Sequence, residues 1–275
     1  MTKPTVPTKK NPVLIVTTGH KERYEHVKLA HEYAAELGAA YIQRKDRSLE
    51  MLRHDTGADI VLVCTDKAKL SIGDADFFFH PSMANTRIKR LRKGENDIVI
   101  DRTGARPGDT VLDCTLGLGS DSIVFAHVVG DSGRVIGTEA SPIIATLVRR
   151  GLQELVSDIK EVTAAMRRVE VVCADHLTYL RSLPDKSVDI VYFDPMFRKT
   201  VEDSVPIEPL RILGDDSPLT EEAIQEAKRV CRRRIVLKER WYSQEFARLG
   251  FQLPAKRASG SVHYGWIDVE GGTDA

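Results

Sequence analysis

The 275-residue chain has no excess of charge of either sign, few cysteines and no long apolar run. Its 40 basic and 40 acidic residues give a formal net charge of zero, so affinity for nucleic acid has to come from local basic clusters. None of the four cysteines forms a Cys-x-x-Cys pair, which argues against zinc and disulfide frameworks, and no metal is expected. No apolar run reaches the length of a membrane-spanning helix.

The composition is that of an ordinary globular protein, with 42% hydrophobic and 29% charged residues. The length allows one large domain and one smaller domain. Residues 1–75 are expected to form the small one, an α/β unit behind a flexible arm, and the arm lacks the apolar core of a signal peptide. We therefore expect a cytoplasmic protein. Apolar runs and helical spacing predict strands at 13–17, 40–42 and 59–64 and helices at 22–37 and 48–53.

Residues 76–106 differ in character and are expected to link the two domains on the substrate-facing side. Residues 87–93 hold five basic side chains, with two apolar residues three positions apart. This spacing predicts a helix whose apolar face packs on the protein while its basic face stays outside. One interpretation is a solvated helix face. The other is a patch that contacts the phosphates of RNA through Arg87, Lys89 and Arg90.

From residue 107 to residue 275 strands and helices alternate regularly. This alternation predicts an α/β domain with a doubly wound, mostly parallel sheet of seven strands. The last two strands are separated only by a turn-like segment, which predicts an antiparallel hairpin at the edge of the sheet. The seven expected strands are 110–114, 134–138, 169–173, 188–193, 234–238, 251–257 and 262–268.

The first strand of this domain leads into the glycine loop Asp113-Cys-Thr-Leu-Gly-Leu-Gly-Ser-Asp121. Gly117 and Gly119 permit a tight turn, and a ligand is expected to approach the backbone there and at Leu116. The dinucleotide fingerprint has a third glycine, whereas this chain has Ser122 in its place. Asp113 before the loop suits a ligand with an amine end better than a pyrophosphate.

The next two strand ends each carry a carboxylate. Glu139 has the spacing expected for an acceptor of hydrogen bonds from two ribose hydroxyls. Asp175, with His176 beside it, follows the third strand and is placed to meet the exocyclic amine of adenine. A loop for the amino-acid end, a carboxylate for ribose and a carboxylate for adenine together predict S-adenosylmethionine as the cofactor, with S-adenosylhomocysteine as the product.

The fourth strand ends in Asp194-Pro195-Met196-Phe197, which has the form (Asp/Asn/Ser)-Pro-Pro-(Tyr/Phe) with methionine in the third place. An exocyclic amine is a poor nucleophile because its lone pair is delocalised into the base. The carboxylate and the Pro195 carbonyl are expected to accept its two N–H bonds, while the Phe197 ring stacks on a flipped base and Met196 contacts the substrate. No strong general base is expected. The alternative is an ordinary turn, since Asp-Pro is common where strands end.

Four stretches of this chain resemble the RsmJ-type bacterial methyltransferases, namely 113–121, 139–142, 192–197 and 236–238. The resemblance spans roughly residues 76–268. It implies the class I, Rossmann-like methyltransferase fold and transfer of a methyl group to the N2 amine of a guanosine in small-subunit ribosomal RNA. The chain departs from the family at Ser120, where a basic residue is common, and at Arg198, where proline is common. The cofactor contacts implied are Ser120, Asp121, Glu139, Ala140, Asp175, His176 and Asp194.

The sequence therefore predicts a methyltransferase that acts on an exocyclic amine of a nucleobase, with guanine N2 in small-subunit ribosomal RNA as the first choice. Its expected partner is ribosomal RNA or a small-subunit particle. Lys238 ends the fifth strand and is expected either to hold an RNA phosphate or to form a plain salt bridge. Three alternatives stay open: a DNA adenine methyltransferase, a small-molecule amine methyltransferase, and a non-catalytic RNA-binding assembly factor that keeps the fold.

Overall fold

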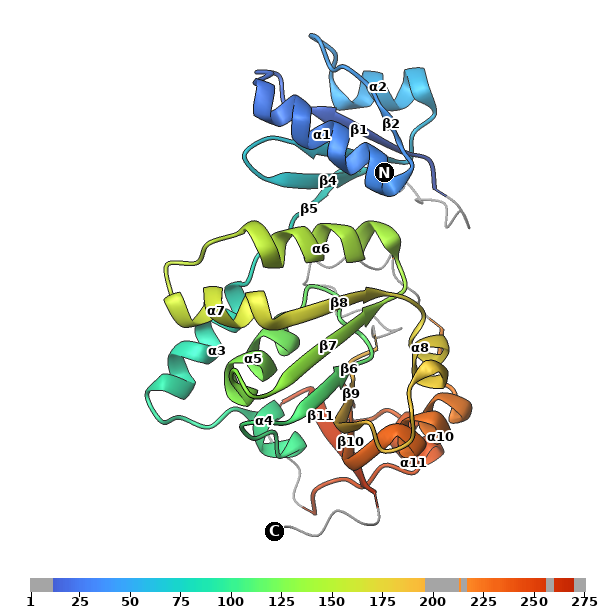
Figure 1. Ribbon diagram of the computed structural model, residues 1–275. Coiled ribbons are helices and arrows are strands. Elements are labelled where there is room, and N and C mark those ends of the chain that lie inside the picture. The colour runs from blue at the N-terminus through green and yellow to red at the C-terminus, as the bar shows by residue number, and fades with distance from the viewer. Residues whose placement is uncertain (1–11, 196–212, 214–216, 256–259, 270–275) are drawn as a thin grey trace. The chain divides into compact units, whose positions relative to one another are not determined.

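The computed structural model describes residues 12–195, 213, 217–255 and 260–269, and divides the chain into two compact units (Figure 1). The first contains the described residues up to Phe79 together with Leu213, and the second contains the remaining described residues from His80 onward. Each unit has its own sheet. Of the segment expected to be a linker, residues 76–79 fall in the first unit and residues 80–106 in the second.

The N-terminal unit is a five-stranded mixed sheet with the strand order β2-β1-β3-β4-β5. The first three strands are parallel, as expected for strand–helix–strand units, and β4 and β5 continue the sheet in antiparallel fashion. These two short strands were not expected from the sequence. The elements are β1 Leu14–Thr18, α1 Tyr24–Leu37, β2 Ala40–Tyr41, α2 Leu49–Thr56, β3 Ile60–Cys64, β4 Ala68–Ile72 and β5 Ala75–Phe77.

The second unit begins with two helices and continues with alternating strands and helices. The first helix buries Ala84 and Ile88, and Asp97 caps the second by accepting hydrogen bonds from the backbone of Val99 and Ile100. The elements are α3 Ser82–Arg92, α4 Ile98–Thr103, β6 Thr110–Asp113, α5 Ser120–Val129, β7 Arg134–Glu139, α6 Pro142–Glu154, α7 Lys160–Arg168, β8 Val169–Cys173, α8 His176–Ser182, β9 Val188–Phe193, α10 Glu221–Val230, β10 Cys231–Arg240, α11 Glu245–Leu249 and β11 Val262–Asp268.

The sheet of this unit has the order β11-β10-β9-β6-β7-β8, and only β11 runs antiparallel to its neighbour. The chain builds outward from β6 through β7 and β8, then crosses to β9 on the other side of β6. The point between β6 and β9 is therefore the topological switch point, where open α/β sheets bind their ligands at the carboxyl ends of the strands. Both the glycine loop and the Asp194 motif leave the sheet at this point.

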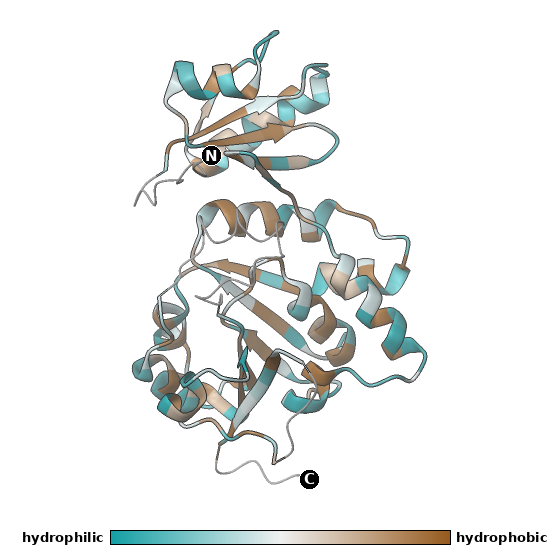
Figure 2. Ribbon diagram, turned by 180° about the vertical axis from the view of Figure 1, so that it is seen from behind, coloured by the Kyte–Doolittle hydropathy of each residue, from teal (hydrophilic) through white to brown (hydrophobic). Residues whose placement is uncertain are grey.

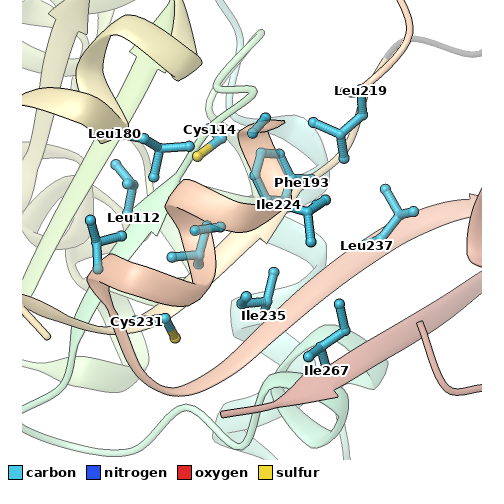
Figure 3. Packing of buried hydrophobic residues seen from close by; sticks show 14 of the residues in the cluster. Leu112, Cys114, Leu180, Phe193, Leu219, Ile224, Cys231, Ile235, Leu237 and Ile267 are labelled. Carbon is cyan, nitrogen blue, oxygen red and sulfur yellow. The ribbon is translucent and has the colours of Figure 1, made fainter. Parts of the chain in front are cut away.

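Apolar side chains fill the space between this sheet and α8, α10 and α11 (Figure 3). Phe193, Ile235 and Leu237 of the strands meet Leu180 and Ile224 of the helices, and all five are buried. Figure 2 shows the strands of both units mostly in the hydrophobic colour, as is usual for parallel strands covered on both faces. Among the described residues, no helix combines the length and apolar character needed to cross a membrane.

The expected antiparallel hairpin of strands 251–257 and 262–268 is not formed by the described residues. Of the expected pairing the antiparallel bridge between Gln252 and Trp266 is present, and β11 also pairs with β10 along seven residue pairs. Pro254 has no N–H group to donate to a ladder, which explains why pairing stops after the bridge. The described part of the sheet therefore has six strands rather than seven, with a single antiparallel edge strand.

Candidate active site

The glycine loop connects β6 to α5 in a turn that only glycine adopts easily. Gly117 and Gly119 have φ angles of 49° and 72°, in the left-handed region. Within the turn, the Gly119 N–H donates to the carbonyl of Leu116 at 2.7 Å, and the Leu116 N–H donates to the Thr138 carbonyl of the neighbouring strand β7 at 3.0 Å. The loop is therefore fixed to the sheet, with its backbone turned toward the carboxyl edge.

Asp113 holds this loop from the inside. Its side chain is buried and accepts hydrogen bonds from Ser122 Oγ at 2.6 Å and from the Thr115 N–H at 3.1 Å. Burial raises the pKa of the Asp113 carboxyl to about 7. This contact explains the serine in the third-glycine place, since a glycine there would leave the carboxylate without its shortest hydrogen bond. The sequence places Asp113 at the amine end of the cofactor, whereas in the structure its carboxylate accepts hydrogen bonds from Thr115 of the loop and Ser122 of α5.

Leu116 packs against Gly137 of β7 so closely that no side chain fits there. A Cβ atom at position 137 would lie 2.4 Å from Leu116 Cδ1 and 3.1 Å from its Cγ. We expect Gly137→Ala to push the glycine loop away from β7, lower the stability by about 1–3 kcal/mol and weaken S-adenosylmethionine binding. Thermal unfolding and titration calorimetry measure the two effects. The double variant with Leu116→Ala should lose less than the sum of the single changes, and simple additivity would contradict this explanation.

The two carboxylates expected to bind ribose and adenine lie on the adjacent strand ends. Glu139 is half-buried at the end of β7, where its Oε1 accepts a hydrogen bond from the Ser141 N–H at 2.9 Å, and Ala140 beside it is exposed. Asp175 caps α8 by accepting from the Thr178 N–H at 2.9 Å. The ring of His176 packs edge-to-face on Phe193 with centroids 6.0 Å apart. The structure thus brings these four residues and the loop to one edge of the sheet.

Asp194 is tied directly to the glycine loop. Its backbone N–H donates to Thr115 Oγ1 at 2.6 Å, and the same hydroxyl lies 3.4 Å from Asp113 Oδ1. One loop residue therefore connects the expected cofactor cradle to the expected catalytic motif. Pro195 is half-buried beside Asp194, while Met196 and Phe197 lie outside the described residues.

Lys238 lies between two carboxylates at the carboxyl edge. Its ammonium group is 2.5 Å from Asp194 Oδ2 and 3.4 Å from Asp121 Oδ2. Burial raises the pKa of Asp194 to about 6, with a further rise from Asp121 and an opposing effect from Lys238. The pKa of Lys238 lies well above its ordinary value, because the two carboxylates outweigh its burial. Lys238 thus forms salt bridges within the site, and its contact with an RNA phosphate stays a prediction.

Asp121, expected to contact the cofactor, is the centre of this charged cluster. It accepts a hydrogen bond from the Tyr192 hydroxyl at 2.8 Å and forms an ion pair with Arg87. Arg87 also makes a bidentate pair with Asp97, at 2.6 and 2.7 Å. The guanidinium of Arg87 is thus engaged by two internal carboxylates, so the geometry favours a role in holding Asp121 over the phosphate contact expected from the sequence.

The other predicted substrate contacts lie apart from the charged cluster. Lys89 and Arg90 are exposed on α3, and Arg90 pairs with Glu95 at 2.8 Å. Four residues of the site were missed from the sequence: Thr115, Tyr192, Asp97 and Tyr264, whose pKa burial raises to about 12. Of these four, only Asp97 could have been identified from the sequence, because it stands directly before the apolar start of a helix, where a capping residue is expected.

The donor set fits S-adenosylmethionine. The backbone turn at Gly117 and Gly119 permits close approach, Glu139 and Asp175 offer carboxylate acceptors on the next two strand ends, and the first helical turn after the loop carries Asp121. A negative charge at that helix start disfavours a pyrophosphate. Among the described residues no group of three or more histidine, cysteine or acidic side chains is arranged to hold a metal ion. Fold and site define a protein of the S-adenosylmethionine-dependent methyltransferase class.

Comparison with known proteins agrees with this class. Residues 37–253 match the model of the family described as "Putative SAM-dependent methyltransferase", and the chain belongs to this family. It is 41% identical over 256 residues to the uncharacterized protein YpiP of Bacillus subtilis, covering 93% of this chain and 99% of YpiP. It is 28% identical over 208 residues to the ribosomal RNA small subunit methyltransferase J of Actinobacillus pleuropneumoniae, covering 70% of this chain and 79% of that one.

A second small subunit methyltransferase J, from Buchnera aphidicola, is 26% identical over 204 residues, with 70% of this chain and 80% of that one covered. Among solved structures, a SAM-dependent methyltransferase from Neisseria gonorrhoeae superposes with a TM-score of 0.62 over 94% of this chain and 97% of that chain. Its sequence identity is 17%, so this likeness supports the fold alone.

Proposed function

We propose that this enzyme methylates the exocyclic N2 amine of a guanine in small-subunit ribosomal RNA. The observation on which the proposal depends is the position of Asp194, whose backbone is hydrogen-bonded to the glycine loop through Thr115 while its carboxylate faces Lys238. In this proposal the motif that binds the amine is therefore one hydrogen bond away from the loop that binds the cofactor. The similarity to two small subunit methyltransferases J, at 26% and 28% identity, supports ribosomal RNA as the substrate.

In this proposal Asp194 and Pro195 prepare the amine. The carboxylate and the Pro195 carbonyl accept hydrogen bonds from its two N–H groups. This withdraws the nitrogen lone pair from the ring and aims it toward the loop. Thr115 fixes the position of Asp194 by accepting its backbone N–H. Orientation of this kind is worth about 7 kcal/mol or more in favourable cases. When bound, S-adenosylmethionine supplies a methyl group that is already activated by its sulfonium.

The charges around Asp194 set its protonation state. With a pKa of about 6, the carboxyl is mostly ionised at neutral pH and able to accept N–H bonds. Lys238 and Asp121 adjust this balance in opposite directions, which makes them positioning residues in the proposed mechanism.

The exposed basic residues of α3 favour a polyanionic substrate over a small amine. Lys89, Arg90 and Lys93 are exposed on the outer face of the helix or at its end, while Ile88 anchors it to the second unit. Charges placed in this way contact phosphates without reading sequence. Reversal of Lys89 and Lys93 to glutamate should weaken RNA binding, and unchanged activity on RNA would favour the small-molecule alternative.

The proposal is tested by mapping modified bases. Ribosomal RNA from a strain that lacks this protein should lose one N2-methylguanosine from the small subunit, detected by mass spectrometry of nuclease fragments. The wild-type gene and the exposed-site control Asp158→Asn should restore it, whereas Asp194→Asn should not. A full set of methylated guanines in the deletion strain would refute the ribosomal assignment.

A further inference from the structure

Two large aromatic side chains are exposed where β10 ends. Trp241 and Tyr242 retain 43% and 49% of their accessible surface. Their rings pack edge-to-face, with centroids 5.6 Å apart and an interplanar angle of 86°. Adjacent exposed aromatic residues of this size are costly to leave in water, and apolar exposure of this kind often marks an interaction site.

The direction of β10 places this pair on the side of the sheet where Asp194 lies. Strand β10 runs parallel to β9, with Leu237 opposite Phe193, so both strands reach the same edge. Lys238 then contacts Asp194, and Trp241 follows three residues further on. At the rise of an extended strand this is about 10 Å along the chain. Trp241 and Tyr242 therefore come directly after β10, at the edge of the sheet where Asp194 lies.

The backbone of the pair is fixed in place. The Trp241 N–H donates to the Ser261 carbonyl at 3.2 Å, next to the last residue pair of the β10–β11 ladder, Arg240 with Val262. The Ser243 N–H then donates to the Arg240 carbonyl at 2.9 Å, which closes a tight turn. A turn held at both ends presents its side chains at defined positions with little loss of backbone freedom on binding.

We propose that Trp241 and Tyr242 form a stacking subsite for the nucleobase next to the methylated one, in single-stranded RNA. This inference rests on the proposed function. A base that leaves its helix for chemistry leaves its neighbour with an uncovered face, and aromatic side chains stack on such faces whatever their sequence. Continuity with the Asp194 edge selects a nucleotide of the substrate as the occupant. A second protein chain is the other possible occupant and is an outcome of the test.

The first test uses the fluorescence of Trp241. The chain has two tryptophans, and Trp266→Phe leaves Trp241 as the only one, so that excitation selective for tryptophan reports on it alone. A short single-stranded oligoribonucleotide from the small-subunit RNA should quench this emission, and an abasic oligonucleotide of the same length and charge should not. Equal quenching by the two oligonucleotides would show that the emission responds to the phosphates and not to a stacked base, and would overturn the subsite. Self-association that is lost on Trp241→Leu, without an effect of RNA, would also overturn it.

The second test separates binding from chemistry. The double variant Trp241→Leu, Tyr242→Leu should raise KM for RNA by about tenfold to a hundredfold with kcat unchanged. Tyr24→Leu, an exposed aromatic residue of the N-terminal unit, should change neither value. Wild-type methylation of RNA with an unaltered KM in the double variant would overturn the subsite and leave the proposed function intact. Absence of any RNA methylation by the wild type would instead refute the proposed function, and the fluorescence comparison would still decide the subsite.

Discussion

Replacement of Asp194 with asparagine is expected to lower kcat by about 10²–10³-fold while leaving the affinity for S-adenosylmethionine within a few fold of wild type. The amide has a single acceptor oxygen, and Lys238 competes with the substrate amine for it. The hydrogen bond from the Asp194 backbone to Thr115 does not involve the side chain and should survive, so the loop keeps its shape. Single-turnover methylation and titration calorimetry separate the two quantities.

A matched control removes a carboxylate from the same unit without touching the site. Asp158 is exposed between α6 and α7, and Asp158→Asn should match the wild type in rate and in cofactor affinity. Unfolding temperatures of both variants should lie within about 4 °C of the wild type. An Asp194→Asn enzyme that turns over at the wild-type rate would remove Asp194 from the mechanism.

Replacement of Lys238 with methionine is expected to move the acidic limb of the pH–rate profile upward by about one pH unit or more. In the proposed mechanism activity requires an ionised Asp194, so it should fall as the pH drops through about 6 in the wild type. Lys238 lowers the pKa of Asp194, and its removal raises that pKa and extends the loss of activity toward neutral pH. Measurement of kcat/KM between pH 5 and pH 9 shows the shift.

Asp121→Asn provides a control of opposite sign. Asp121 raises the pKa of Asp194 through its negative charge, so its removal should move the acidic limb to lower pH. Arg87 keeps its ion pair with Asp97, the N-cap of α4, and Tyr192 keeps its edge-to-face contact with Phe125, which limits the loss of structure. Shifts of the same sign in both variants would show that general damage, rather than the charge on Asp194, sets the profile.

The positions of the strands along the sequence were largely predictable, because central parallel strands are covered on both faces and read as apolar runs. Strands β6, β7 and β9 are mostly buried runs of this kind, and β10 has such a run only in its middle, Ile235 to Leu237, whereas the edge strand β8 is partly exposed. The edges of both sheets were less predictable. Strands β4 and β5 are short and partly polar, and residues 251–255 look like a strand until Pro254 is considered as a missing donor.

The positions of Glu139, Asp175 and Asp194 at the carboxyl edge were predictable, because each lies at or just after the end of a strand, while their roles stay predictions. Long-range pairs were not predictable, because nothing local connects Arg87 to Asp121 across 34 positions or Asp194 to Lys238 across 44. A run of basic residues also does not show which of its members turns inward. Arg87 lies one position before Ile88, on the side of α3 that packs against the protein, while Lys89 and Arg90 face outward.

The most direct test is the identity of the atom that receives the methyl group. Small-subunit ribosomal RNA from the deletion strain, free or in particles, should be incubated with the pure enzyme and S-adenosylmethionine labelled in its methyl group, then digested to nucleosides. We predict label in N2-methylguanosine with the wild type and at least about a hundredfold less with Asp194→Asn. Label on a ring nitrogen, a ring carbon or a ribose hydroxyl would contradict it.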